Sequence, residues 1–381
     1  DNLKDYVKIS YELTQDGLLI GKGKLAEVSV VPHSEGKTNL QVNVPENGKC
    51  YLKLTYHLKK EMPLLEEDYI LGFDEIEVSQ KDAKCQLAEK WVEKTVTDSE
   101  LQVSEDDTQI HIKGREFAYT IDRRTALFTE MKFAGREYLN HPMELNIWRA
   151  PTDNDMYIKS EWKKAHYDKA YTRAYTTEVV QGKHGVKITS HASVVAETVQ
   201  KILDVTITWK IEAAGKIDAD IAVTKDDEFP DLPRFGVRMF LDKKLSAVRY
   251  FGMGPQESYC DKHQAASHGL YRADVGDLHE DYIRPQENGS HYDCEYVELN
   301  NSRYGIVVSA ENAFSFNASY YTQEELEEKT HNYELTESDS VVFCVDYALN
   351  GIGSNSCGPV VLEQYRFDDV LFRFQFTLIP Y

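Results

Sequence analysis

The chain has 381 residues, of which 41% are hydrophobic and 28% are charged, the balance of an ordinary folded globular protein. Disordered, collagen-like and disulfide-rich classes are therefore excluded. The 64 acidic residues outnumber the 43 basic ones, for a formal net charge of −21. Such a surface repels phosphate backbones and anionic lipids, so we expect neither nucleic acid nor a membrane as a partner. No apolar run is long enough to span a bilayer.

The cysteines are scattered, without a CxxC pair, whereas a zinc site needs paired ligands at short spacing. We therefore predict reduced, mostly buried thiols and a reducing compartment, the cytoplasm. The chain begins with Asp1 and has no apolar signal core. We expect a fragment or a processed form.

The first 80 residues alternate apolar and polar side chains, as half-buried antiparallel strands do. An immunoglobulin-like sandwich has about seven strands. We therefore predict a partial immunoglobulin-like β-sandwich over residues 1–90, with its first strands missing. The strands are predicted at 7–13, 25–31, 40–44, 51–58 and 70–78.

Residues 80–100 are polar, which indicates a domain junction near 90–98. Alternation then resumes and continues almost to the C-terminus, so we predict one large all-β domain over 98–381, built as two facing sheets or a closed barrel. Helices are expected only at 161–171 and, opened by a capping box at Thr322, through Lys329. The alternating stretches are 109–113, 118–122, 126–128, 186–195, 202–211, 217–223, 248–251, 294–299, 305–310, 341–347 and 370–378.

Three segments interrupt the strand pattern with Gly, Pro and polar residues: 146–155, 251–261 and 282–289. The first is acidic but lacks the Gly and Glu of a calcium loop, so no metal site is expected in this chain. In the third, Arg284, Glu287 and Asn288 share one loop. These side chains can bond several sugar hydroxyls, or they can satisfy buried backbone groups where two sheets meet. Both interpretations stay open.

No nucleophile motif and no phosphate-binding loop occurs. Glycoside hydrolysis needs two carboxylates at a set separation, and among 64 acids the sequence cannot select the pair. The residues alone indicate a large β domain whose polar loops can bind carbohydrate.

The same segments resemble signatures of the C-terminal region of bacterial β-galactosidases of glycoside hydrolase family 2. WRAPTDND at 148–155, GMGPQESYCD at 252–261 and YIRPQENG at 282–289 are similar to family motifs, and GIGSNSCGP at 351–359 resembles its late glycine-rich loop. The resemblance implies a galactose-mutarotase-like supersandwich for 98–381 and, more weakly, the preceding immunoglobulin-like domain.

This resemblance also implies the function: retaining hydrolysis of terminal non-reducing β-D-galactosides. In the family the two catalytic Glu residues lie on a (β/α)₈ barrel, which this chain lacks, so the chain alone is predicted to be inactive. The implied partners are a galactoside substrate, the barrel domain of the same enzyme and further copies in a homo-oligomer. No cofactor is implied for this chain, whereas Mg²⁺ and Na⁺ are compatible with the full-length enzyme.

By the same resemblance, Asn154, Asp155 and the loop 156–160 flank the substrate, together with Ser356 and Cys357 of the glycine-rich loop. Cys357 stands where some members carry a Trp that stacks on the sugar. A thiol offers no aromatic platform, which puts stacking from this position in doubt.

Two alternatives remain. A mutarotase-like epimerase needs a His base facing a carboxylate, for which Glu287 with His291 or His331 are the candidates. A free-standing carbohydrate-binding module is the other. If the chain normally packs against a barrel, we expect an exposed apolar patch.

Overall fold

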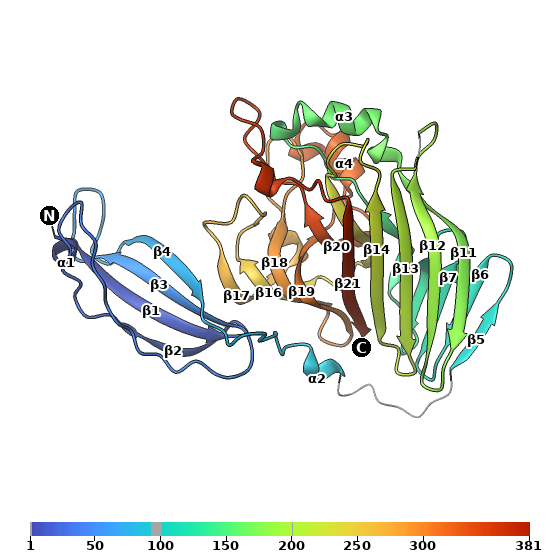
Figure 1. Cartoon of the computed structure of the whole chain (residues 1–381), viewed down its shortest axis with the longest axis horizontal. Coiled ribbons are helices and arrows are strands. Elements are labelled where there is room, and N and C mark those ends of the chain that lie inside the picture. Colours follow the sequence, from blue (N-terminus) through green and yellow to red (C-terminus); the bar gives the residue numbers. More distant parts are fainter. Residues whose placement is uncertain (1, 93–100, 200) are drawn as a thin grey trace. The chain divides into compact units, whose positions relative to one another are not determined.

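The computed structural model describes residues 2–92, 101–199 and 201–381 (Figure 1). The chain divides into two compact units, Asp1–Leu87 with Ser267–Tyr271, and Ala88–Ala266 with Arg272–Tyr381. The junction expected near 90–98 falls largely on residues 93–100, outside the described residues. The domain bounds 1–90 and 98–381 therefore stay a prediction.

The first unit contains a four-stranded sheet in the order β2-β1-β3-β4. Its elements are α1 (Leu3–Tyr6), β1 (Val7–Gln15), β2 (Leu18–Lys24), β3 (Cys50–Leu58) and β4 (Ile70–Glu77). Gln15 pairs with Leu18, so Asp16 and Gly17 alone form the hairpin loop, with φ of +48° and +75°. Positive φ at both positions gives the turn whose twist matches that of the flanking strands, for which Asp-Gly is a favoured pair.

The strands predicted around 7–13, 51–58 and 70–78 are confirmed, whereas those at 25–31 and 40–44 are wrong. Residues 25–31 make scattered bonds and no ladder: Leu25 N donates to Ile9 O, Leu3 N donates to Val30 O at 2.8 Å, and Val30 N donates to Asn2 Oδ1 at 2.9 Å. Alternation identifies a chain that can be extended, but a strand also needs a neighbour with free backbone groups. The place beside β1 is taken instead by the glycine-containing segment β2.

A twelve-stranded sheet and a five-stranded sheet contain the other strands, which confirms the all-β class. The large sheet follows the path β10-β15-β20-β19-β21-β14-β13-β12-β11, and β18 joins β16 to β19. Its strands are β10 (Leu139–Asn146), β11 (Tyr171–Gln181), β12 (Gly185–Val195), β13 (Leu203–Glu212), β14 (Ile217–Lys225), β15 (Arg234–Asp242), β16 (Ala247–Gly254), β17 (Ser267–Asp274), β18 (Ser290–Asn300), β19 (Gly305–Ser319), β20 (Ser340–Leu349) and β21 (Leu371–Pro380). Every alternating stretch predicted from 186 to 378 falls on one of them.

The smaller sheet, in sequence order, closes the core of the second unit. Trp209 of β13 is fully buried, with its ring centroid 4.9 Å from that of Phe128, and its Nε1 donates to Ala126 O at 2.8 Å. Tyr119 OH donates to Gly215 O at 2.7 Å. These contacts hold the small sheet against one face of the large one. Its strands are β5 (Gln102–Glu105), β6 (Gln109–Lys113), β7 (Phe117–Asp122), β8 (Leu127–Phe133) and β9 (Arg136–Glu137).

Helices are short: α2 (Glu89–Val92), α3 (Ile158–Lys164) and α4 (Gln323–Glu328). The helix predicted at 161–171 is wrong in its bounds, because His166 adopts φ of +57° and β11 begins at Tyr171. The capped helix is confirmed, since Thr322 Oγ1 accepts from Glu325 N at 3.1 Å. Both α3 and α4 lie at the same end of the second unit (Figure 1). Among the described residues no helix is both long and apolar enough to cross a membrane.

Candidate functional site: a hollow above a buried ion-pair network

The first motif segment is held by a buried two-pronged ion pair. Arg149 Nε and Nη2 donate to the two carboxylate oxygens of Asp155 at 3.2 and 2.7 Å, and the side chains are 0% and 3% exposed. Asp155 also accepts from Thr152 N at 2.9 Å, which fixes the turn before η2 (Asp153–Asp155). Burial alone would lower the pKa of Arg149, but Asp155 beside it raises the pKa above its ordinary value. The guanidinium therefore stays charged.

The glycine-rich segment 351–359 is bound to this pair. Arg149 also donates to the carbonyls of Asn350 and Gly351, at 2.5 and 3.1 Å. Asn154 Nδ2 donates to Gly353 O at 2.6 Å, and Ser356 N donates to Asn154 Oδ1 at 3.4 Å. Three backbone carbonyls of one loop thus depend on two side chains of another.

The second motif segment contributes two carboxylates that accept from backbone N–H groups. Asp261 accepts from Ile352 N at 2.9 Å and from Gly353 N at 2.7 Å. Glu257 Oε2 accepts from Gly289 N at 2.9 Å, which ties this segment to the third motif. Four segments that are far apart in the sequence therefore form one assembly.

In the third motif segment, two of the three candidate residues bond to other groups of the protein and hold the fold together. Glu287 is buried, and its Oε2 accepts from Arg234 Nη1 at 3.2 Å, while Arg234 Nε donates to the buried Asp346 at 3.0 Å. Burial raises the pKa of Glu287, and Arg234 and Arg149 oppose that rise. Asn288 is also buried and its Oδ1 accepts from Glu280 N at 3.0 Å. Only Arg284 is exposed to solvent.

Beside this assembly lies a hollow of about 520 Å³. Asn154 and Asp155, which the resemblance places beside the substrate, line it; that role stays a prediction. Ser356 and Cys357 do not, although Asn355 just before them does. Cys357 is exposed. The full lining is Asn154, Asp155, Tyr157, Ile158, Ser160, Glu161, Asp231, Asn350, Asn355, Val360, Val361 and Arg366.

The lining mixes amides, hydroxyls and carboxylates, which suits a polyhydroxylated ligand better than an anion. Large apolar side chains on the two adjoining loops are exposed, among them Tyr157 at 61% and Val360 at 58%. Met156 and Leu362 belong to the same group. Within 2–92, 101–199 and 201–381, no three or more His, Cys, Asp and Glu side chains gather as a metal site.

Several side chains that line the hollow were not predicted from sequence. Asn355 lies inside the glycine-rich motif at 351–359, so its position beside Ser356 and Cys357 was the signal that could have identified it. Asp231 and Arg366 come from loops outside every motif, and nothing in their local sequence marks them. Burial raises the pKa of Asp231, and Asp368 adds to that rise.

Comparison with known proteins identifies the family of the chain. Residues 113–378 match the family model of the β-galactosidase small chain, and residues 1–79 match that of β-galactosidase domain 4. The chain belongs to the β-galactosidase small-chain family.

Among curated relatives, the chain is 42% identical over 380 residues to the β-galactosidase of Actinobacillus pleuropneumoniae, covering 99% of this chain and 37% of that protein. It is 32% identical over 351 residues to the β-galactosidase of Staphylococcus xylosus, covering 91% and 34%. The chain therefore spans about a third of the length of these relatives. A solved galactose 1-epimerase from Lactobacillus acidophilus is similar with a TM-score of 0.41 at 8% identity, covering 75% of this chain and 99% of that one.

Proposed function

We propose that the chain is the C-terminal portion of a retaining β-galactosidase of glycoside hydrolase family 2, which hydrolyses terminal non-reducing β-D-galactosides. In this proposal its large unit, a supersandwich, forms one wall of the galactoside site. The catalytic Glu pair lies in a barrel domain outside these 381 residues. The observation that carries the proposal is the 42% identity to a β-galactosidase over 99% of this chain but only 37% of the relative.

The side chains of the hollow at Asn154 favour one wall of a galactoside site over a complete active site. Its amide and hydroxyl groups can accept and donate bonds to sugar hydroxyls, while the Asp155 carboxylate is occupied by Arg149 and the Thr152 N–H. The exposed apolar side chains around it, Tyr157 and Val360 among them, favour contact with another protein surface. We assign that surface to the barrel of the same enzyme.

The remaining parts of the proposal follow the family. The full-length enzyme forms a homo-oligomer in the bacterial cytoplasm, binds neither nucleic acid nor a membrane, and takes Mg²⁺ and Na⁺ outside this chain. An epimerase that acts alone is disfavoured by burial, because Glu287 and His291 are both inaccessible and Glu287 is paired with Arg234. His331 is exposed and bonds Thr330, so it does not complete a buried pair.

The test is hydrolysis of a chromogenic β-galactoside by this chain, first alone and then with the complementary N-terminal fragment. We expect no turnover by the chain alone and activity on mixing. Turnover by the purified chain would contradict the proposal, because it would place an acid–base pair within these residues. If neither the chain alone nor the mixture hydrolyses the substrate, although sedimentation shows that the folded fragments associate, the proposal is also contradicted.

A pair of matched variants then tests the wall itself. Asn355→Ala removes an amide that lines the hollow, and we expect KM of the complemented enzyme to rise about three- to tenfold, the loss of one hydrogen bond. Asn312→Ala, at an exposed position of β19 outside the hollow, is the control and should leave KM unchanged. Equal effects of the two substitutions would reject a substrate contact at Asn355.

A further inference from the structure

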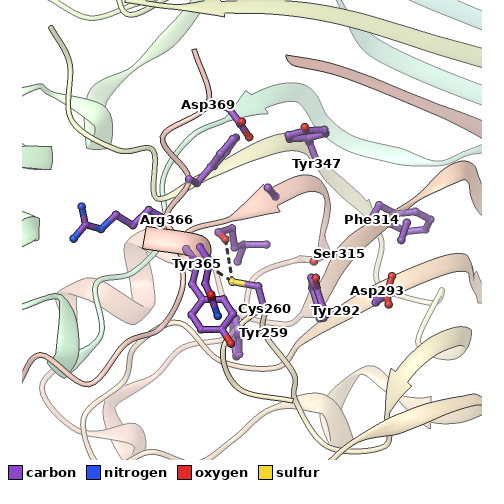
Figure 2. A pocket seen from close by; sticks show the side chains of 15 residues that line it. Tyr259, Cys260, Tyr292, Asp293, Phe314, Ser315, Tyr347, Tyr365, Arg366 and Asp369 are labelled. Carbon is purple, nitrogen blue, oxygen red and sulfur yellow. Dashed lines mark hydrogen bonds between the residues drawn. The ribbon is translucent and has the colours of Figure 1, made fainter. Parts of the chain in front are cut away.

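A second hollow of about 320 Å³ lies where β18, β19 and β20 meet the segment after η6 (Glu363–Tyr365) (Figure 2). None of the site residues discussed above belongs to it except Arg366, which lines both hollows. Figure 2 shows Arg366 pointing away from the other labelled side chains. The lining is Tyr259, Cys260, Tyr292, Asp293, Ala313, Phe314, Ser315, Tyr347, Ala348, Leu349, Gln364, Tyr365, Arg366, Phe367 and Asp369.

An irregularity in the sheet creates this hollow. Strand β19 pairs with β21 through residues 306–309 and with β20 through 315–319, so it changes partners in between. The neighbouring strand β18 loses register between His291 and Cys294, and Asp293 there adopts φ of +54°. A bulge of this kind re-aims a side chain, and here the bulged residue is one that lines the hollow.

Three polar side-chain groups that line the hollow have no hydrogen-bond or ion-pair partner among the described residues. The hydroxyls of Tyr292 and Tyr347 and the carboxylate of Asp369 make no hydrogen bond or ion pair to the part of the chain that the structure describes. Their rings are nevertheless held in place: Tyr347 stacks on Phe372 at 4.9 Å between centroids, and Tyr292 stacks on His263 at 5.6 Å. Pre-oriented side chains with unused polar ends are what a binding pocket requires.

The geometry points to a binding site for a neutral sugar of monosaccharide size, separate from the hollow at Asn154. Aromatic rings supply apolar surface for the C–H face of a sugar. Carboxylates at Asp293 and Asp369, which both line the hollow, accept hydrogen bonds from hydroxyls. A volume of about 320 Å³ is at the small end for ligand pockets, which favours one sugar ring over an oligosaccharide.

Charge and reactivity narrow the ligand class further. Two carboxylates face the hollow, and the only basic residue of its lining, Arg366, points away, so an anionic ligand is repelled. Partial burial, with the neighbouring Asp368, raises the pKa of the solvent-accessible Asp369. Burial raises the pKa of the Cys260 thiol to about 11, so no thiolate nucleophile is present. The site is built to bind a sugar and not to transform it.

The experiment is a ligand-observed NMR titration of the chain with galactose. We expect saturable binding with a Kd on the order of millimolar. Asp369→Asn and Asp293→Asn should each weaken binding about tenfold, because a charged acceptor is lost. Asn tolerates the positive φ at position 293, and Asp369 is exposed, so both variants should fold. Galacturonate should bind about tenfold more weakly than galactose.

Two controls make the result decisive. Asp368→Asn changes the same residue type one position away but outside the lining, and Asn355→Ala changes the other hollow; both should keep the wild-type Kd. No saturable signal up to the solubility limit of galactose overturns the proposal. So does binding that survives both carboxylate substitutions, binding lost with Asn355→Ala, or a preference for galacturonate. Because the readout is binding, it stands or fails independently of galactosidase activity.

Discussion

Two arginine–aspartate pairs of the large unit share a geometry and differ in their surroundings. Arg149 contacts Asp155 through Nε and Nη2, and Arg373 of β21 contacts Asp220 of β14 through the same two nitrogens. The first pair is 0% and 3% exposed, and the second is 61% and 21% exposed. Fork geometry alone therefore does not distinguish a pair that organises a site from a pair on the surface.

The difference lies in what else each arginine must satisfy. Arg149 is inaccessible to solvent, so its N–H groups need protein acceptors. It donates to two carbonyls at the start of the glycine-rich loop as well as to Asp155. Removing one partner of a buried pair leaves an uncompensated charge, whereas an exposed pair exchanges its partner for water. We infer that the buried pair fixes the shape of the hollow at Asn154, while the surface pair contributes little to either stability or shape.

The largest predicted effect follows from breaking the buried pair. Arg149→Ala leaves Asp155 buried without its cation, and we expect the free energy of unfolding to fall by about 3–5 kcal/mol, measured by urea titration at neutral pH. The double variant Arg149→Met/Asp155→Leu should lose less than the single one, because no charge is left behind. A single variant within error of wild type, or a double variant that is worse, would contradict this account.

A smaller effect is expected from a group that is buried without any ion partner. His291 stacks on Phe316 with centroids 5.1 Å apart, and its Nε2 has no hydrogen-bond partner in the described part of the chain. Burial lowers its pKa to about 4, from an ordinary value of 6.5, against the weaker opposing effect of the Met253 carbonyl. The native imidazole is therefore neutral across the range in which an unfolded one takes up a proton.

The direction of the pH dependence follows. Between pH 6.5 and about pH 4 the unfolded chain binds a proton that the native chain does not, so stability falls as pH falls through this window. At pH 5 this single group should cost about 2 kcal/mol relative to pH 7. In His291→Phe, the drop in unfolding free energy from pH 7 to pH 5 should be smaller by that amount. Parallel pH profiles for the two proteins would mean that His291 titrates normally.

How far the sequence predicts the fold depends on whether a strand shows its period. β13 and β14 alternate buried and partly exposed residues and were predicted, whereas β15 is buried at nearly every position and was missed. Arg234 and Arg238 occupy buried positions of β15. These two charged residues interrupt the run of apolar residues by which a fully buried strand is recognised in a sequence. The burial of Arg234 is explained by its pairing with Asp346, a residue of β20, and with Glu287, and both pairings are tertiary contacts.

The candidate site divides in the same way. Asn154 and Asp155 were predicted from their motif and line the hollow, because one short turn carries both. The motif at 282–289 left two interpretations open, and for Glu287 and Asn288 the structure favours the satisfaction of buried groups. Asp231 and Arg366 reach the hollow from distant loops. No local pattern can specify a convergence that depends on how strands 100 or more residues apart are paired.

The smallest predicted effect completes the comparison. Arg373→Ala removes the exposed partner of Asp220, and the carboxylate it leaves behind regains water, so the urea midpoint should stay within experimental error of wild type. Measured beside Arg149→Ala, it holds the fork to the carboxylate constant and varies the burial, together with the carbonyl bonds that the buried arginine makes. A loss at Arg373 as large as that at Arg149 would show that the fork itself stabilises the sheet, and burial would no longer explain why one pair matters to the site.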